Sequence, residues 1–234
     1  IGSANIIEAE LEALDALARG SIIYGNASAA TATLTKGTAN QVLTSDGTDI
    51  SWEAAGSGGI GSFDGTNTLI SSGGDAGDAI TDGTNNIFIG EDAGGAMTVG
   101  DHNIAIGHDA FNATTTGSAD YNVAIGQDAL GGAAVTSDGN VAIGKLAGNA
   151  VTSADDGIYI GTSAGATVTT GNNNIAIGEL AMSVGTVTGI DNVCIGSYAG
   201  QDLAAGANNV FLGFTAGLNA TTQKQSVIIG CQAN

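Results

Sequence analysis

The sequence predicts an all-β chain whose main part is a parallel β-solenoid, and two observations carry this prediction. First, a short string of Asn (or a stand-in), Ile or Val, any residue, Ile or Leu, and Gly occurs nine times, each time followed three residues later by Ala. Second, the closing glycines lie 17 to 19 residues apart. Self-similarity at this period is typical of solenoids, in which each repeat stacks on the previous one because it cannot bury its apolar side alone. The closing glycines are Gly90, Gly107, Gly126, Gly144, Gly161, Gly178, Gly196, Gly213 and Gly230.

Residues 1–20 are expected to form an N-terminal helix, with the helical pattern running from Ala4 to Arg19. Ile7, Leu11 and Leu14 fall at helical spacing, and Gly20 ends the run. The apolar seam is narrow, as in a coiled coil, and two heptads are marginal alone, so we expect partner strands. A capping helix folded on its own chain is the alternative.

Residues 21–56 are expected to form a small β module, because short β-prone runs alternate there with Gly, Asn and Asp turns. Residues 57–84 follow as a linker and a degenerate first coil. The stretch EAAGSGGIG is rich in Gly and Ser, and Asn67, Leu69 and Ile70 stand in repeat order with Ser71 in the place of Gly. Residues 85–234 are the β-solenoid repeats.

Within each repeat, a strand of about four residues is predicted, as in NIAIG at 103–107. Side chains alternate faces along a strand, so we expect the aliphatic pair, for example Ile104 and Ile106, to point into the coil. The residue between the pair is then expected to point outward, and it is apolar in all nine repeats. An apolar outward flank needs a cover, and a second copy of the chain is the simplest one. These middle residues are Phe88, Ala105, Ala124, Ala142, Tyr159, Ala176, Cys194, Phe211 and Ile228.

The remaining repeat positions predict two corners and a variable loop. The Gly after each strand suits a backbone position with positive φ, and the Ala three residues later suits a crowded corner. Loops rich in Thr, Ser, Asp and Gly absorb the insertions. Nine coils at roughly 4.8 Å each give a rod segment about 43 Å long. We expect a homo-oligomer, with a homotrimer around the solenoid axis favoured.

Charge and hydropathy exclude several partners. The chain has 23 acidic and 4 basic residues, a formal charge of −19, so a phosphate backbone or an anionic lipid surface is repelled. No run of about 18 apolar residues is present, which argues against membrane insertion. Because the chain begins with Ile, we expect a processed product or a part of a longer protein.

The sequence contains no pattern that identifies a catalytic, cofactor-binding or metal-binding residue, and no cofactor is expected. Cys194 and Cys231 are interpreted as small apolar fillers, and His108 as a surface histidine beside Asp109. Three acids share one repeat position in successive coils, and we expect them to be solvated, with a shared calcium ion as the alternative. These acids are Asp92, Asp109 and Asp128.

Two stretches resemble known proteins. Strings such as NIAIG, NVAIG and NVFLG resemble the head repeats of trimeric autotransporter adhesins, which form left-handed parallel β-rolls. They are still more similar to the longer-period repeats of phage tail fibres that precede a self-cleaving chaperone domain. Residues 20–52, ending in QVLTSDGTDISW, are similar to a module of phage structural proteins. The period of 17 to 19 favours the phage resemblance.

The resemblance implies a structural, non-enzymatic component of a phage virion appendage: a trimeric rod, located on the virion, that contacts other virion or fibre proteins at its ends. It also implies contact with a host surface glycan or protein, and cleavage of a C-terminal chaperone after Asn234. A trimeric adhesin on a bacterial cell surface is one alternative. A polysaccharide-degrading β-helix enzyme is another. No binding residue is identified.

Overall fold

The structure is a computed structural model that describes residues 22–25, 31–36, 38, 41–45, 50–54, 62–63, 68–70, 76–113, 119–132 and 135–233. The chain divides into two compact units, Ile1–Gly56 and Ser57–Asn234. The predicted helix at 4–19 lies outside the described residues.

The first unit contains two antiparallel strand pairs. Strand β1 (Ile22–Gly25) pairs with β2 (Thr31–Leu34), and β3 (Gln41–Ser45) pairs with β4 (Ile50–Ala54). Ahead of β3, the backbone N–H and the hydroxyl of Thr38 both donate to Oε1 of Gln41, at 2.7 and 3.0 Å. These contacts hold the start of the QVLTS strand. The short strands expected in this part of the chain are present among the described residues.

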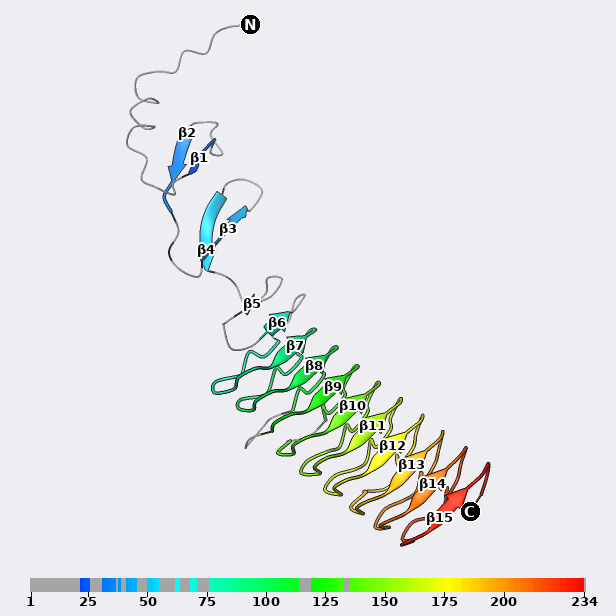
Figure 1. Cartoon of the computed structure of the whole chain (residues 1–234). Coiled ribbons are helices and arrows are strands. Elements are labelled where there is room, and N and C mark those ends of the chain that lie inside the picture. The colour runs from blue at the N-terminus through cyan, green and yellow to red at the C-terminus, as the bar shows by residue number, and fades with distance from the viewer. Residues whose placement is uncertain are drawn as a thin grey trace, which may run out of the picture. The chain divides into compact units, whose positions relative to one another are not determined.

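The second unit is a parallel β-solenoid of about eight turns (Figure 1). It begins with β5 (Ser62–Phe63), which is antiparallel to β6 (Thr68–Ile70), and β6 pairs in parallel with the first repeat strand. Every later pairing is parallel and in register. The repeat strands are β7 (Ile87–Ile89), β8 (Ile104–Ile106), β9 (Val123–Ile125), β10 (Val141–Ile143), β11 (Ile158–Ile160), β12 (Ile175–Ile177), β13 (Val193–Ile195), β14 (Val210–Leu212) and β15 (Val227–Ile229).

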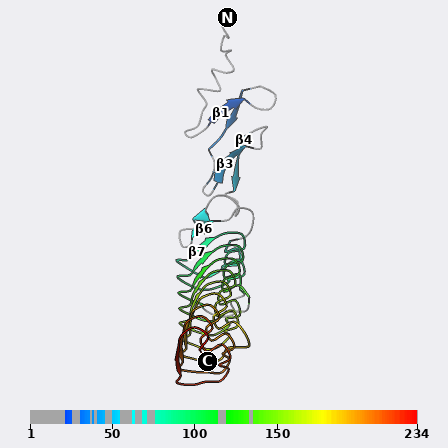
Figure 2. The same ribbon diagram turned by 90° about the vertical axis from the view of Figure 1, so that its right-hand side faces the viewer.

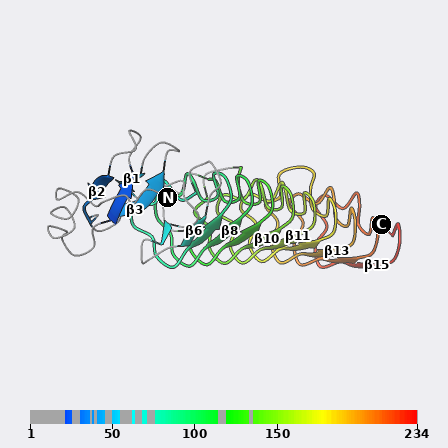
Figure 3. The ribbon, with the colours of Figure 1, turned by 90° about the horizontal axis from the view of Figure 1, so that it is seen from above.

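The strands lie one after another along a single side of the solenoid (Figure 3), and the coils repeat the same outline (Figure 2). Eight intervals of roughly 4.8 Å separate nine strands, so the sheet from β7 to β15 is about 38 Å long. The nine coils counted in the sequence correspond to these nine strands. Each repeat strand has three residues, and the described remainder of the coils consists of turns, bends, isolated parallel bridges and irregular segments.

Glycine makes the first corner of each coil, as predicted. Gly178 has φ +130°, and a Cβ added there would lie 2.5 Å from the carbonyl carbon of Gly196 in the next coil. Only a residue without a side chain fits both the backbone angle and the close stacking. Three residues later, Ala181 is completely buried, and the same holds for the matching alanines from Ala93 to Ala216. Both corner predictions are therefore confirmed.

The predicted orientation of the strand side chains is wrong. The middle residues are the buried ones: Ala105 and Cys194 are 0% exposed, while Ile104 and Ile106 are only half-buried and point outward. Side chains two residues apart in a strand lie on the same face. Because the buried Asn103 lies two residues before Ala105, Ala105 also faces the interior. The large middle residues Phe88, Tyr159 and Phe211 each lie against a glycine that leaves room for the ring.

A row of buried asparagines runs along the inside of the solenoid, one residue before seven of the nine repeat strands. In a typical step, Nδ2 of Asn103 donates to the carbonyl of Ala119 at 2.7 Å, and Oδ1 of Asn103 accepts the backbone N–H of Asn122 at 2.9 Å. Each amide thus satisfies backbone groups that are sealed from water. The members of this amide row are Asn86, Asn103, Asn122, Asn140, Asn174, Asn192 and Asn209.

The amide row is interrupted once, in the coil of β11. Gly157 stands there in place of Asn, and a Cβ added to it would collide with the hydroxyl of Tyr159. The ring of Tyr159 is completely buried, and its hydroxyl is one of two buried side-chain polar atoms without a partner in the described part of the chain. Burial raises the pKa of this phenol well above its usual value. Tyr159 therefore fills the space that an asparagine takes in the other coils.

Candidate interaction surface

The outward side of the solenoid sheet is aliphatic along its whole length. We call the aliphatic face the first and third residues of strands β7 to β15, which are all Ile, Val or Leu. Parallel pairing in register puts like side chains on top of one another, for example Ile158 on Ile175 and Ile160 on Ile177. The result is two continuous columns of aliphatic side chains without an ionisable group.

The side chains of the aliphatic face remain accessible in the single chain. Exposure is 37% for Ile87 and 36% for Ile143, and it rises to 69% for Val227 and 66% for Ile229 at the end of the solenoid. Two columns about 38 Å long cover roughly 400 Å², within the range of the largest apolar patch on a monomer and typical of an interaction site. The predicted apolar flank is therefore present, but different residues form it.

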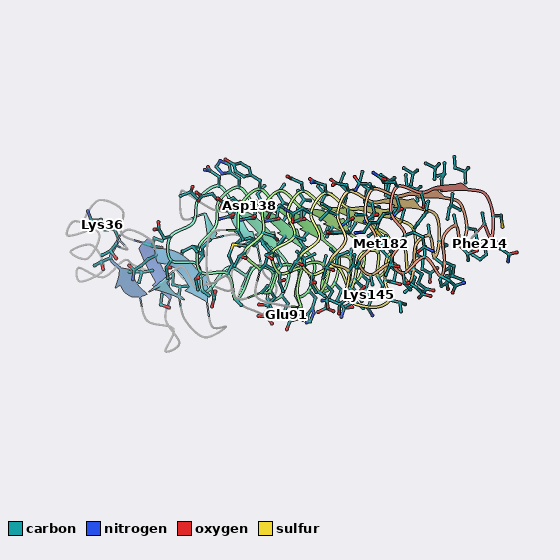
Figure 4. All side chains as sticks on the ribbon, turned by 90° about the horizontal axis from the view of Figure 1, so that it is seen from below. Lys36, Glu91, Asp138, Lys145, Met182 and Phe214 are labelled. Atoms are coloured by element: carbon teal, nitrogen blue, oxygen red, sulfur yellow. The ribbon has the colours of Figure 1, made fainter. Side chains whose placement is uncertain are left out.

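Mostly polar residues border the aliphatic face on both sides, with exposed Phe214 among them on one edge and exposed Ile190 on the other. Glu91 and Lys145 lie on one edge and Asp138 on the other (Figure 4). His108 occupies the same repeat position as Glu91 and Lys145. His108 is half-exposed and pairs through Nδ1 with Oδ2 of Asp109 at 2.7 Å, in agreement with its interpretation as a surface histidine beside an acid. A second acid, Glu91, lies 3.9 Å from Nε2 of His108.

Asp92, Asp109 and Asp128 occupy one corner position in three successive coils, all with φ near +54°. This matches the shared repeat position predicted for them. In the part of the chain that the structure describes, no three His, Cys, Asp or Glu side chains gather closely enough to hold a metal ion. For these three acids, a shared calcium ion stays the alternative to solvated side chains.

A second acid column was missed in the sequence. Oδ1 of Asp101 accepts the backbone N–H of Thr84 at 2.7 Å, and Oδ1 of Asp120 accepts that of Asp101 at 2.8 Å. Asp138 and Asp155 continue the same pattern in the next two coils. The hydrogen bonds from Thr84 hold the pKa of Asp101 below its usual value. We call these four residues the aspartate ladder.

The two cysteines lie in different environments. Cys194 is buried at a middle position, and burial raises the pKa of its thiol to about 12. Its interpretation as an apolar filler is confirmed. Cys231 is exposed, so the same interpretation was wrong for it. It lies one residue after the last corner glycine, where the matching residues of the other coils are polar or charged except Phe214.

Among the described residues, we find no helix with the length and apolar character needed to cross a membrane. Comparison with models of protein families, with curated proteins and with solved structures finds no match to this chain.

Proposed function

We propose that this chain is a non-catalytic structural component of a phage virion appendage, a tail fibre or a similar part, and that it assembles as a homotrimer through the aliphatic face. The observation that supports this best is the uninterrupted pair of columns of Ile, Val and Leu on the outside of the sheet. An apolar strip of this length is costly to leave in water.

A second copy of the same chain suits the aliphatic face for two physical reasons. The strands of a second copy repeat at the same interval of roughly 4.8 Å, so the aliphatic side chains of two copies interlock along the entire length of the sheet. The face also carries no ionisable residue, so copies that each bear a formal charge of −19 make contact without burying charge. Three copies, rather than two, follow from the resemblance of the repeats to proteins that assemble as trimers.

The rod character follows from the parallel sheet. Each coil bonds to its neighbours through backbone ladders, corner contacts and the amide row, so stiffness accumulates along the stack. A stiff spacer that carries a tip or offers loops to a host surface needs no catalytic group. The phage setting is supported by the similarity of residues 20–52 to a module of phage structural proteins and by the long repeat period.

Native mass spectrometry of the purified chain tests the assembly. We expect a species with three times the chain mass of 22.6 kDa. Ile177→Glu places a charge in the middle of the aliphatic face and is expected to yield folded monomers. Thr188→Glu is the matched control, since Thr188 is exposed and lies outside the sheet. A wild-type monomer or dimer at micromolar concentration, or an Ile177→Glu trimer, contradicts the proposed assembly.

The location is tested separately by immunogold electron microscopy with antibodies against the solenoid. Labelling of an appendage on phage particles supports the proposal. Labelling of a bacterial cell surface without phage favours the adhesin alternative. Shortening of a bacterial polysaccharide by the purified chain, lost on carboxylate replacement, replaces the structural proposal with the enzymatic one.

A further inference from the structure

A second surface lies on the edge of the solenoid sheet, at the residue that precedes each buried asparagine. This residue has a left-handed backbone in every coil, with φ of +60° at Asn85, +61° at His102 and +59° at Tyr121. Side chains at this position stack from coil to coil. The rings of His102 and Tyr121 lie 4.8 Å apart with an interplanar angle of 13°.

The stack stops at Tyr121 because the next coil has glycine at this position. Gly139 has φ +71° and supplies no side chain to cover the second face of the Tyr121 ring, which is 62% exposed. One coil further, the carboxylate of Asp156 leans over Gly139, since a Cβ added to Gly139 would lie 2.5 Å from Oδ1 of Asp156. The level of Gly139 is therefore bounded by an aromatic ring on one side and a carboxylate on the other.

The charges around this level are all negative. Asp120 and Asp138 of the aspartate ladder directly precede Tyr121 and Gly139 in the chain. Each uses Oδ1 to accept a backbone N–H, and within the described ranges Oδ2 of either residue accepts no hydrogen bond. In the same ranges, no lysine or arginine forms an ion pair with these acids, because the only ion pairs involve His108.

We propose that Tyr121, Gly139 and Asp156 bind the guanidinium group of an arginine from a partner protein. A planar guanidinium at the level of Gly139 continues the ring stack and lies within the range of a cation–π contact with Tyr121. The Asp156 carboxylate lies on the other face of the guanidinium and attracts its positive charge. A lysine ammonium matches the charge but not the flat stack, and a neutral sugar leaves the carboxylates without a cation.

Ring-labelled tyrosine in the full chain provides the readout, since the chain contains only 4 tyrosines. The probe is the peptide acetyl-Gly-Arg-Gly-amide, titrated against the ¹³C ring resonances. We expect a saturable shift of the Tyr121 signal and at least fivefold weaker binding of the lysine analogue. Gly139→Asn places a side chain at this level, as Asn85 and Asn173 do in their coils, and is expected to weaken arginine binding at least fivefold.

A pair of charge variants separates local recognition from general attraction to an acidic chain. Asp156→Asn is expected to weaken binding about threefold. Asp191→Asn, two coils further along the same edge, removes the same charge and is expected to leave binding unchanged. An unshifted Tyr121 signal, equal binding of the lysine peptide, unchanged affinity in Gly139→Asn, or a shift of Tyr121 by maltotriose, which would indicate a sugar site, each overturns the proposal.

Discussion

Replacement of Asn192 by alanine tests the amide row as the element that holds the coils together. Nδ2 of Asn192 donates to Oδ1 of Asn174 at 3.0 Å and to the carbonyl of Gly206 at 2.8 Å. Oδ1 accepts the backbone N–H and Nδ2 of Asn209 at 3.2 and 2.9 Å. All three asparagines are completely buried, so no water replaces the lost partner.

The expected cost follows from these four hydrogen bonds. At about 1 kcal/mol net for each bond, the free energy of unfolding falls by about 4 kcal/mol, because buried partners stay unsatisfied. Urea denaturation followed by circular dichroism at a fixed protein concentration measures the loss. Thr188→Ala is the control, since Thr188 is exposed and truncation there is expected to cost less than about 0.5 kcal/mol. A loss below about 1 kcal/mol for Asn192→Ala refutes the argument.

Three further predictions concern the corner, the pH dependence and the thiols. Gly178→Ala is expected to destabilise the chain by more than about 2 kcal/mol in urea, whereas Gly185→Ala, whose added Cβ meets nothing closer than 3.9 Å, is expected to cost about 1 kcal/mol for its positive φ alone; equal costs contradict the stacking argument. The folded pKa of Asp101 lies below the usual 3.8, so its contribution to stability is present above about pH 4 and is lost as the pH falls through the folded pKa. Asp101→Asn is expected to reduce the stability change measured between about pH 5 and about pH 2.5, and an unaltered pH profile counts against this role. At about pH 8, a thiol reagent is expected to modify exposed Cys231 and not Cys194, whose pKa of about 12 keeps it protonated, giving one reactive thiol per native chain and two after denaturation.

The period and the corner residues could be predicted from the sequence because both follow from local chemistry. A glycine with φ near +130° and an alanine in a crowded corner leave few alternatives, so Gly178 and Ala181 identify the turn without any knowledge of the coil interior. Strand direction also follows, because repeats of 17 to 19 residues stacked in one sense produce parallel pairing.

The inward face could not be predicted from side-chain size. Ile104 and Ile106 are larger and more apolar than Ala105, yet Ala105 is the buried one. The signal that would have decided the matter is Asn103, whose amide serves buried backbone groups and so fixes the parity of the strand. In this repeat, the polar residue identifies the interior better than the apolar pair does.

The aspartate ladder was missed although the sequence carries a signal for it. Asp101, Asp120 and Asp138 each lie two residues before an asparagine of the amide row, so alignment of the repeats on that asparagine places them in one column. His102 and Tyr121 share a repeat position in the same way but differ in residue type, so the contact between their rings becomes visible only in the stacked coils.

The interruption at Gly157 has a mechanical consequence. Four asparagines lie before Gly157 and three after it, so the amide row forms two separate hydrogen-bonded segments with the ring of Tyr159 between them. Oδ1 of Asn140 accepts the backbone N–H of Gly157 at 2.8 Å, but Gly157 has no side-chain amide to form a hydrogen bond with Asn174. When the solenoid is stretched along its axis, we expect the coils to separate first at Gly157, because the side-chain hydrogen bonds of the amide row are missing there.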